Sequence, residues 1–305
     1  MNTKTYLLLL ALFSTILTFA QNNTSVPEPI QVEDIVKTIS RGNQPGLKVL
    51  LYQTEKKDAE SQWDALLRKK AKAKTENAQN EIIARGITLK EVSNRPLNIY
   101  AVFNPYADYV EMYVFFETDS VFLTKTVNET EYLSARKFVR DFAVQTYREA
   151  VSDQIKTEEK NLSSLEKELK KLQKENDCLH EQINKEKRNV DNNNEKISML
   201  KLDQQRVRQL IQTQKTELDQ LRDASTSEEV IKAEEKKLKA LEKELTRLEK
   251  DEDQLRRNNA KNETVIRHYE RDLADNASAT ERKRQEINAQ KMLLTNLRNM
   301  LKAIQ

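Results

Sequence analysis

The stretch that decides the fold is residues 207–245, which read VRQLIQTQKTELDQLRDASTSEEVIKAEEKKLKALEKEL. Apolar residues recur every seven positions on both sides of its centre, but the two series do not join. Counting by sevens from Leu218 reaches Lys239, one residue past Leu238. A single unbroken helix would therefore rotate its apolar seam away from any partner at this point. The pattern predicts two helices and a break between them.

The break coincides with residues 223–229, DASTSEE. Ser225 with Glu228, and Thr226 with Glu229, both match a capping box, in which a hydroxyl and a carboxylate satisfy the free amides of a helix start. One helix is therefore predicted to end near Asp223 and the next to begin near Ser227.

The seven-residue pattern continues away from the break in both directions, which is typical of a coiled-coil seam. Antiparallel arms require facing residues whose numbers have a constant sum, and 452 pairs apolar residues with one another. It also pairs the polar interruptions, Asn176 with Asn276 and Asn193 with Asn259. Buried amides need amide partners, so this register is preferred to one shifted by seven residues. The predicted structural seam includes Asn176, Leu179, Ile183, Asn193, Ile197, Leu241, Leu245, Leu255, Asn259, Tyr269, Leu273 and Asn276.

Three layers of this register are mismatched. Leu169 faces Lys283, Leu172 faces Thr280 and Leu200 faces Glu252. Either the long polar side chains reach out to solvent there, or a second molecule covers the apolar side.

The composition agrees with long helices. The last proline is Pro105 and the last glycine is Gly86, so residues 106–305 contain neither helix breaker. Each arm of about 80 residues would be roughly 120 Å long at 1.5 Å per residue.

Residues 31–131 hold ten of the 18 aromatic residues and predict a small α/β head. The expected order is α, β, α, β, β, β, α, with an antiparallel or mixed sheet and helices on one face. Apolar spacing in residues 32–39 predicts a short helix there. The other expected elements are a strand at 47–52, a helix at 58–74, a strand at 81–92 kinked at Gly86, strands at 97–103, 109–116 and 121–123, and a helix from Tyr132 capped by Thr130.

The N-terminus has the pattern of a secretion signal. Lys4 precedes an apolar run over residues 6–19, and Thr18 and Ala20 provide small residues for cleavage before Gln21. No later stretch is apolar enough to span a bilayer. We therefore expect an exported chain, periplasmic or secreted, with no membrane span in its mature form.

Few residues suggest chemistry. His180 and His268 lie off the seam, without a cluster of metal-ligand spacing. Cys178 is either a free bystander or the site of an intermolecular disulfide. The net charge of +3 lacks the one-sided field of a nucleic-acid binder. No catalytic, cofactor or metal residues are predicted, and we expect no enzyme.

Two short motifs carry a resemblance. The signal ends in Phe19-Ala20-Gln21, and the head holds Gly42-Asn43-Gln44-Pro45-Gly46-Leu47. With the head-then-coil layout, these make the chain similar to a family of exported Bacteroidota proteins for which no activity is known. The resemblance implies a Gram-negative periplasm.

These observations favour a non-enzymatic protein that binds unidentified protein partners, a second copy of itself among the candidates, or acts as a spacer in the cell envelope. The alternatives are a periplasmic holdase-type chaperone and a head that binds a small ligand. The expected organisation is a signal peptide (1–20), a disordered leader (21–30), the α/β head (31–131), a first coiled-coil helix (132–224), a hairpin turn (225–229) and a second coiled-coil helix (230–305).

Overall fold

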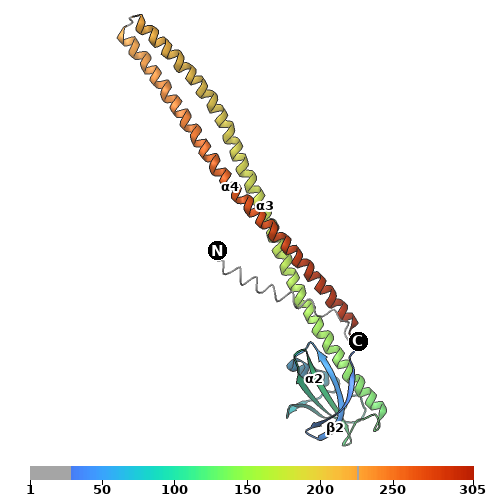
Figure 1. Ribbon diagram of the computed structural model, residues 1–305. Coiled ribbons are helices and arrows are strands. Elements are labelled where there is room, and N and C mark those ends of the chain that lie inside the picture. The colour runs from blue at the N-terminus through green and yellow to red at the C-terminus, as the bar shows by residue number, and fades with distance from the viewer. Residues whose placement is uncertain (1–28, 225–226) are drawn as a thin grey trace. The chain divides into compact units, whose positions relative to one another are not determined.

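The computed structural model describes residues 29–224 and 227–305, and these form an antiparallel sheet and a long helical hairpin (Figure 1). The chain divides into two compact units. Unit 1 is the chain up to Ser164 together with Asn288–Gln305, and unit 2 is Leu165–Ile287. The predicted α+β class with a helical hairpin is confirmed. The predicted signal peptide, most of the predicted leader and the centre of the predicted turn, Ser225 and Thr226, lie outside the described residues.

The head sheet in unit 1 has seven strands in the order β1-β2-β6-β5-β4-β3, with β7 pairing β6, and every pairing is antiparallel. Its strands are β1 (Val32–Ile39), β2 (Gly42–Tyr52), β3 (Thr75–Ala78), β4 (Glu81–Ile87), β5 (Leu97–Pro105), β6 (Tyr109–Thr118) and β7 (Val121–Phe122).

Three helices complete the described chain: α2 (Lys56–Ala71), α3 (Glu129–Asp223) and α4 (Glu228–Ala303). Helix α3 begins earlier than expected, because Asn128 rather than Thr130 caps it. The side-chain oxygen of Asn128 accepts a hydrogen bond from the backbone N–H of Glu131 at 3.1 Å. Helix α2 ends at a left-handed Lys72, before the predicted end at Lys74.

The helix expected at residues 32–39 is wrong, since these residues form strand β1. They pair with β2 over eight positions, from Val32 opposite Val49 to Ile39 opposite Gly42. Val, Ile and Thr dominate the segment, and β-branched side chains favour a strand. The spacing of Val32 and Ile39 that resembled a helix instead places them on opposite faces of the sheet, where they join different clusters. The observed head order is therefore β, β, α, five strands and then the long helices.

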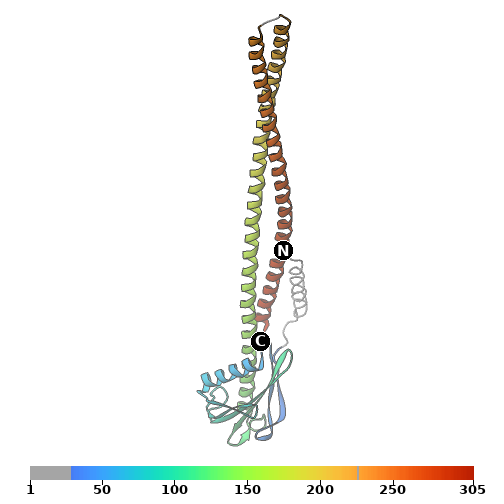
Figure 2. The ribbon, with the colours of Figure 1, turned by 90° about the vertical axis from the view of Figure 1, so that its left-hand side faces the viewer.

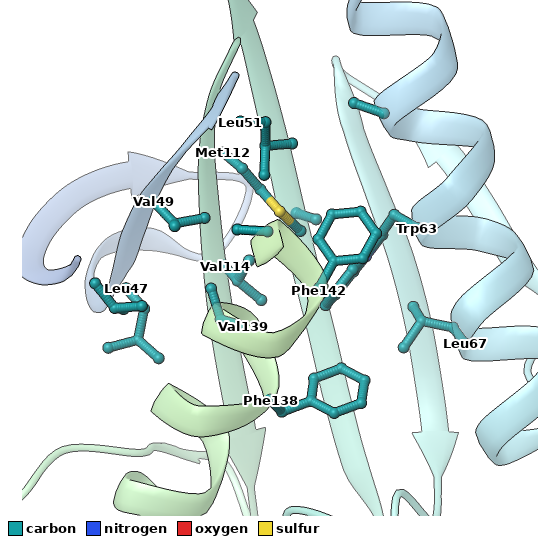
Figure 3. Packing of buried hydrophobic residues seen from close by; sticks show 14 of the residues in the cluster. Leu47, Val49, Leu51, Trp63, Leu67, Met112, Val114, Phe138, Val139 and Phe142 are labelled. Carbon is teal, nitrogen blue, oxygen red and sulfur yellow. The ribbon is translucent and has the colours of Figure 1, made fainter. Parts of the chain in front are cut away.

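One face of the sheet is covered by α2 and the first turns of α3 (Figure 3). Trp63 of α2 is fully buried, and its ring lies edge-on to Phe138 and Phe142 of α3, with centroids 5.7 and 4.9 Å away. Beneath them lie the side chains that alternate along β2 and β6, including Leu51 and Met112. This alternation of buried residues positions the sheet against the helices.

The opposite face of the sheet is covered in part by the sheet's own hairpin. Ser40, in the turn between β1 and β2, donates hydrogen bonds from its N–H and its hydroxyl to Glu81 of β4, both at 2.7 Å. Because β6 and β5 separate β2 from β4, the hairpin must curl across the face to reach Glu81. A second apolar cluster lies on this face: Ile39, Ile83, Tyr100, Val102, Phe115 and Phe122.

Two glycines have distinct roles in the sheet. Gly86 adopts φ +59° where the β4–β5 register shifts, which is the kink predicted in that strand. Gly46 of β2 lies against Phe115, and a Cβ added there would be 2.5 Å from the Phe115 ring and 2.9 Å from the Val114 carbonyl oxygen. Only a hydrogen atom fits between the curled hairpin and β6.

Gly46→Ala is expected to lower the free energy of unfolding of the head by about 1–3 kcal/mol, because overpacking forces the backbone apart. The urea midpoint of head unfolding should fall accordingly. Trp63 is the single tryptophan and is buried in the head, so its fluorescence during urea unfolding reports this unit. Gly86→Asn is the control, because a Cβ there meets no atom within 4 Å and Asn tolerates a positive φ. Equal midpoints for both variants would contradict the packing described for Gly46.

Candidate functional site

The most extended feature of unit 2 is the seam between α3 and α4, which run antiparallel and side by side (Figures 1 and 2). Two amide layers set its register. Asn193 donates to Asn259 at 2.9 Å, and Asn176 donates to Asn276 at 3.4 Å. In both pairs the residue numbers sum to 452. Asn259 also donates to Asn194 at 2.8 Å, so this layer is a network of three amides.

None of the twelve seam residues named from the sequence is fully exposed. Ile183, Ile197, Asn259 and Asn276 are buried. The other eight are half-buried: Asn176, Leu179, Asn193, Leu241, Leu245, Leu255, Tyr269 and Leu273. Partial exposure of leucines is the consequence of a seam made by only two helices, which leaves its edges open.

Two of the three mismatched layers contain polar contacts, whereas in the third the buried hydroxyl of Thr280 has no hydrogen-bond partner among the described residues. Lys283 reaches Glu168 at 2.8 Å and Glu286 at 2.7 Å. Burial alone would lower the pKa of Lys283, but the bonds to these two carboxylates outweigh it and raise the pKa. Glu252 accepts a hydrogen bond from the buried Gln204 at 2.8 Å and pairs with Arg256 at 2.7 Å. Both charges are therefore partnered within the chain.

One flank of the hairpin carries a ladder of ion pairs between the helices, which the sequence reasoning missed. In unit 2 it joins Lys187 to Glu270, Arg208 to Glu249, Lys215 to Glu242 and Arg222 to Glu235, at 2.8–3.8 Å. In every pair the numbers sum to 457, and the α3 members are separated by multiples of seven. Each exposed pair contributes only about 0.2–1 kcal/mol. Their shared spacing nevertheless favours one register, as charges beside a coiled-coil seam do. The charge pattern beside the seam was the signal that could have revealed them.

The parts of α3 and α4 that belong to unit 1 have the same spacing of flank ion pairs. Arg298 pairs with Glu159 at 2.7 Å, again summing to 457. Gln290 donates to the carboxylate of Glu158 at 2.7 Å. Leu294 and Leu297 of α4, and Ile304 just after its end, are buried in the head cluster. The last turns of the chain are therefore part of the head's core.

The curled face of the head contains a buried carboxylate. Glu117 of β6 is 2% exposed and accepts hydrogen bonds from Arg41 at 2.8 Å, Tyr100 at 2.9 Å and Asn98 at 3.0 Å. Burial would raise the pKa of Glu117, but these three donors, led by Asn98, lower it overall. Arg41 belongs to the β1–β2 turn, so the charge pair fastens the hairpin over the sheet.

Few groups with catalytic or ligand-binding potential come together in the described ranges. Within residues 29–224 and 227–305, no three His, Cys, Asp or Glu side chains are placed to hold a metal ion. His268 lies one turn from Asp272, 3.2 Å away, and Cys178 is exposed. Carboxylates of Glu55, Asp58, Asp108 and Asp153 line an open hollow in unit 1.

Among the described helices, none is long and apolar enough to cross a membrane. No protein-family model matches the chain, and no curated protein is similar to it.

Asn193→Leu is expected to lower the melting temperature of the helices. The buried amide of Asn259 then loses its partner across the seam, which costs about 1–3 kcal/mol of stability. The double variant Asn193→Leu with Asn259→Leu should recover or exceed the wild-type stability, since an apolar pair replaces a polar one. Circular dichroism at 222 nm measures both. If the single variant melted no lower than the double variant, the amide pair would not be the constraint described here.

A second prediction concerns acid stability of the head. Because the folded pKa of Glu117 is lower than its unfolded value, its stabilisation is present above the unfolded pKa, near 4.3, and is lost as the pH falls through the folded pKa. Glu117→Gln should therefore cost about 1–3 kcal/mol at pH 7 and less near pH 3, as measured by Trp63 fluorescence. Exposed Glu129→Gln is the control. An equal loss for Glu117→Gln at both pH values would contradict a charged Glu117.

Proposed function

We propose that this chain is an exported protein of the cell envelope that acts without catalysis, by binding other proteins or holding them apart along its helical hairpin. The observation that carries the proposal is the single register of α3 and α4 in unit 2. Two amide layers and four flank ion pairs obey it. A hairpin specified this closely along its length is suited to present surfaces at defined positions.

Export rests on the sequence of residues 1–21, and the periplasm is the compartment that the Bacteroidota resemblance favours. The head gives such a protein a second folded unit with a surface of its own. Its sheet is covered by helices on one face and by its own hairpin on the other, and it leaves Tyr106 at the β5–β6 turn 52% exposed, stacked on Tyr109.

A holdase-type chaperone is the second candidate, favoured by exposed apolar side chains on α3 in unit 2. Met199, Leu202 and Leu210 are 66%, 68% and 48% exposed. Light scattering of an aggregating outer-membrane protein distinguishes it. Suppression at equimolar protein, abolished by replacing the three side chains with Ser, supports a holdase, and unchanged aggregation removes this candidate.

The leading proposal is tested by shortening both arms at one level. Residues 208–214 face residues 238–244 when the sum is 452, so deleting both segments removes one heptad pair, about 10 Å, and keeps the register. The chain carries a photo-crosslinking residue in place of Asp219, near the end of α3, or in place of Tyr106 in the head. It is expressed with its own leader in a Gram-negative host.

We expect crosslinks to envelope proteins from both positions, with the deletion reducing the crosslinks from position 219 several-fold and leaving those from position 106 unchanged. Deleting 208–214 alone is the matched control, because it breaks the register and should lower the melting temperature. Absence of crosslinks from both positions would contradict the proposal.

A further inference from the structure

Helix α3 carries a second stripe of regularly spaced residues, on the surface that does not face α4. Met199, Asp203, Arg206 and Leu210 are separated by four, three and four residues, the spacing of a coiled-coil seam. All four are exposed, and Leu202 beside them is 68% exposed. The stripe lies wholly in unit 2.

The surface around the stripe is mixed in charge. Exposed Ser198, Gln209 and Thr213 are neutral, whereas exposed Glu195 and Lys196, one turn before Met199, are charged. A solvated helix face normally carries Lys and Glu, whereas the centres of protein interfaces are depleted of charge and enriched in Met and Arg. The exposed Met199, Leu202 and Leu210 beside Arg206 are the part of this composition that indicates a contact surface.

The two charges of the stripe have no partner within the part of the chain that the structure describes. Asp203 and Arg206 take part in none of the ion pairs or hydrogen bonds found there, although ion pairs are frequent along both arms. Along the stripe, a carboxylate and a guanidinium lie side by side between two apolar residues. When a second copy of the stripe runs in the opposite direction, carboxylate meets guanidinium and apolar residue meets apolar residue.

We propose that two copies of this chain associate through this stripe, with their α3 helices antiparallel about a two-fold axis. Antiparallel seams pair residues whose numbers have a constant sum, and 409 places Met199 against Leu210 of the second copy. The same sum places Asp203 against Arg206 of the second copy. Symmetry repeats both contacts, which gives two apolar pairs and two ion pairs.

Charge complementarity favours a second copy in this orientation. A parallel arrangement in register would set Asp203 against Asp203 and Arg206 against Arg206, and like charges repel. Reversal with the sum of 409 converts both repulsions into attractions. The contact has only two apolar pairs, far fewer than a standard interface of about 1,600 Å² contains, so association should be weak and concentration-dependent.

The test is sedimentation equilibrium of the full chain up to millimolar concentration, with Cys178→Ser throughout to prevent disulfides. The mass should rise with concentration from one chain toward two. Asp203→Arg and Arg206→Asp should each weaken association at least tenfold, because each creates like-charge pairs. An equimolar mixture of these two variants should restore it, and so should the double variant.

Asp253→Arg on α4 is the matched control and should leave association unchanged. Circular dichroism of each variant checks that the helices remain formed. A chain that stays monomeric throughout overturns the proposal, and so does a dimer that neither charge reversal weakens. Crosslinks of the undeleted chain to envelope proteins do not require this contact, so the two proposals fail separately.

Discussion

The pairing of amides inside an otherwise apolar seam is the constraint on which the hairpin depends. An Asn at a seam position loses its water when the helices close, and a partner amide is the replacement that keeps its donors and acceptors satisfied. Asn193 meets Asn259 and Asn276 meets Asn176 in the same register, and a slide by one heptad would leave all four without amide partners. Leucine layers alone tolerate such slides, because one leucine packs against another in any register. The flank ion pairs then reinforce a register that the amides have selected.

The head depends on the same two helices. Its core includes Val139 and Phe142 from the start of α3, and Leu294 and Leu297 from the end of α4, together with the sheet residues under Trp63. An isolated sheet of this size would expose one apolar face, and α2 alone does not cover it. Folding of unit 1 therefore requires the two ends of the hairpin to be present. The boundary expected at residue 131 follows a change in sequence pattern, whereas the compact unit containing the sheet continues to Ser164 and resumes at Asn288.

The sequence predicts the hairpin more completely than the head for a physical reason. A coiled coil repeats every seven residues, so the misfit between Leu218 and Leu238 locates the break, and Asn176 and Asn193 locate the register. The ion-pair ladder follows the same period, so the charges beside the seam carry a signal for the register as well. In the head, strand β1 was mistaken for a helix, since eight residues give too few turns to separate the two periods. The curl that brings Ser40 to Glu81 has no local signal, because it depends on the absence of a side chain at Gly46 opposite Phe115. No sequence pattern identifies Glu117 as a buried carboxylate, because its partners come from two distant segments, the β1–β2 turn and β5.

The central claim is that α4 returns along α3 with facing residues summing to 452, and one distance within the chain tests it most directly. Native Cys178 is exposed, and Ala274→Cys adds a second exposed thiol at the facing position. Spin labels on both, in doubly labelled chains diluted with unlabelled protein, report their separation by pulsed electron resonance. Helix axes about 8–10 Å apart and outward labels predict about 20–35 Å. A continuous extended helix would separate the labels by about 140 Å, so the absence of a short distance would contradict the hairpin.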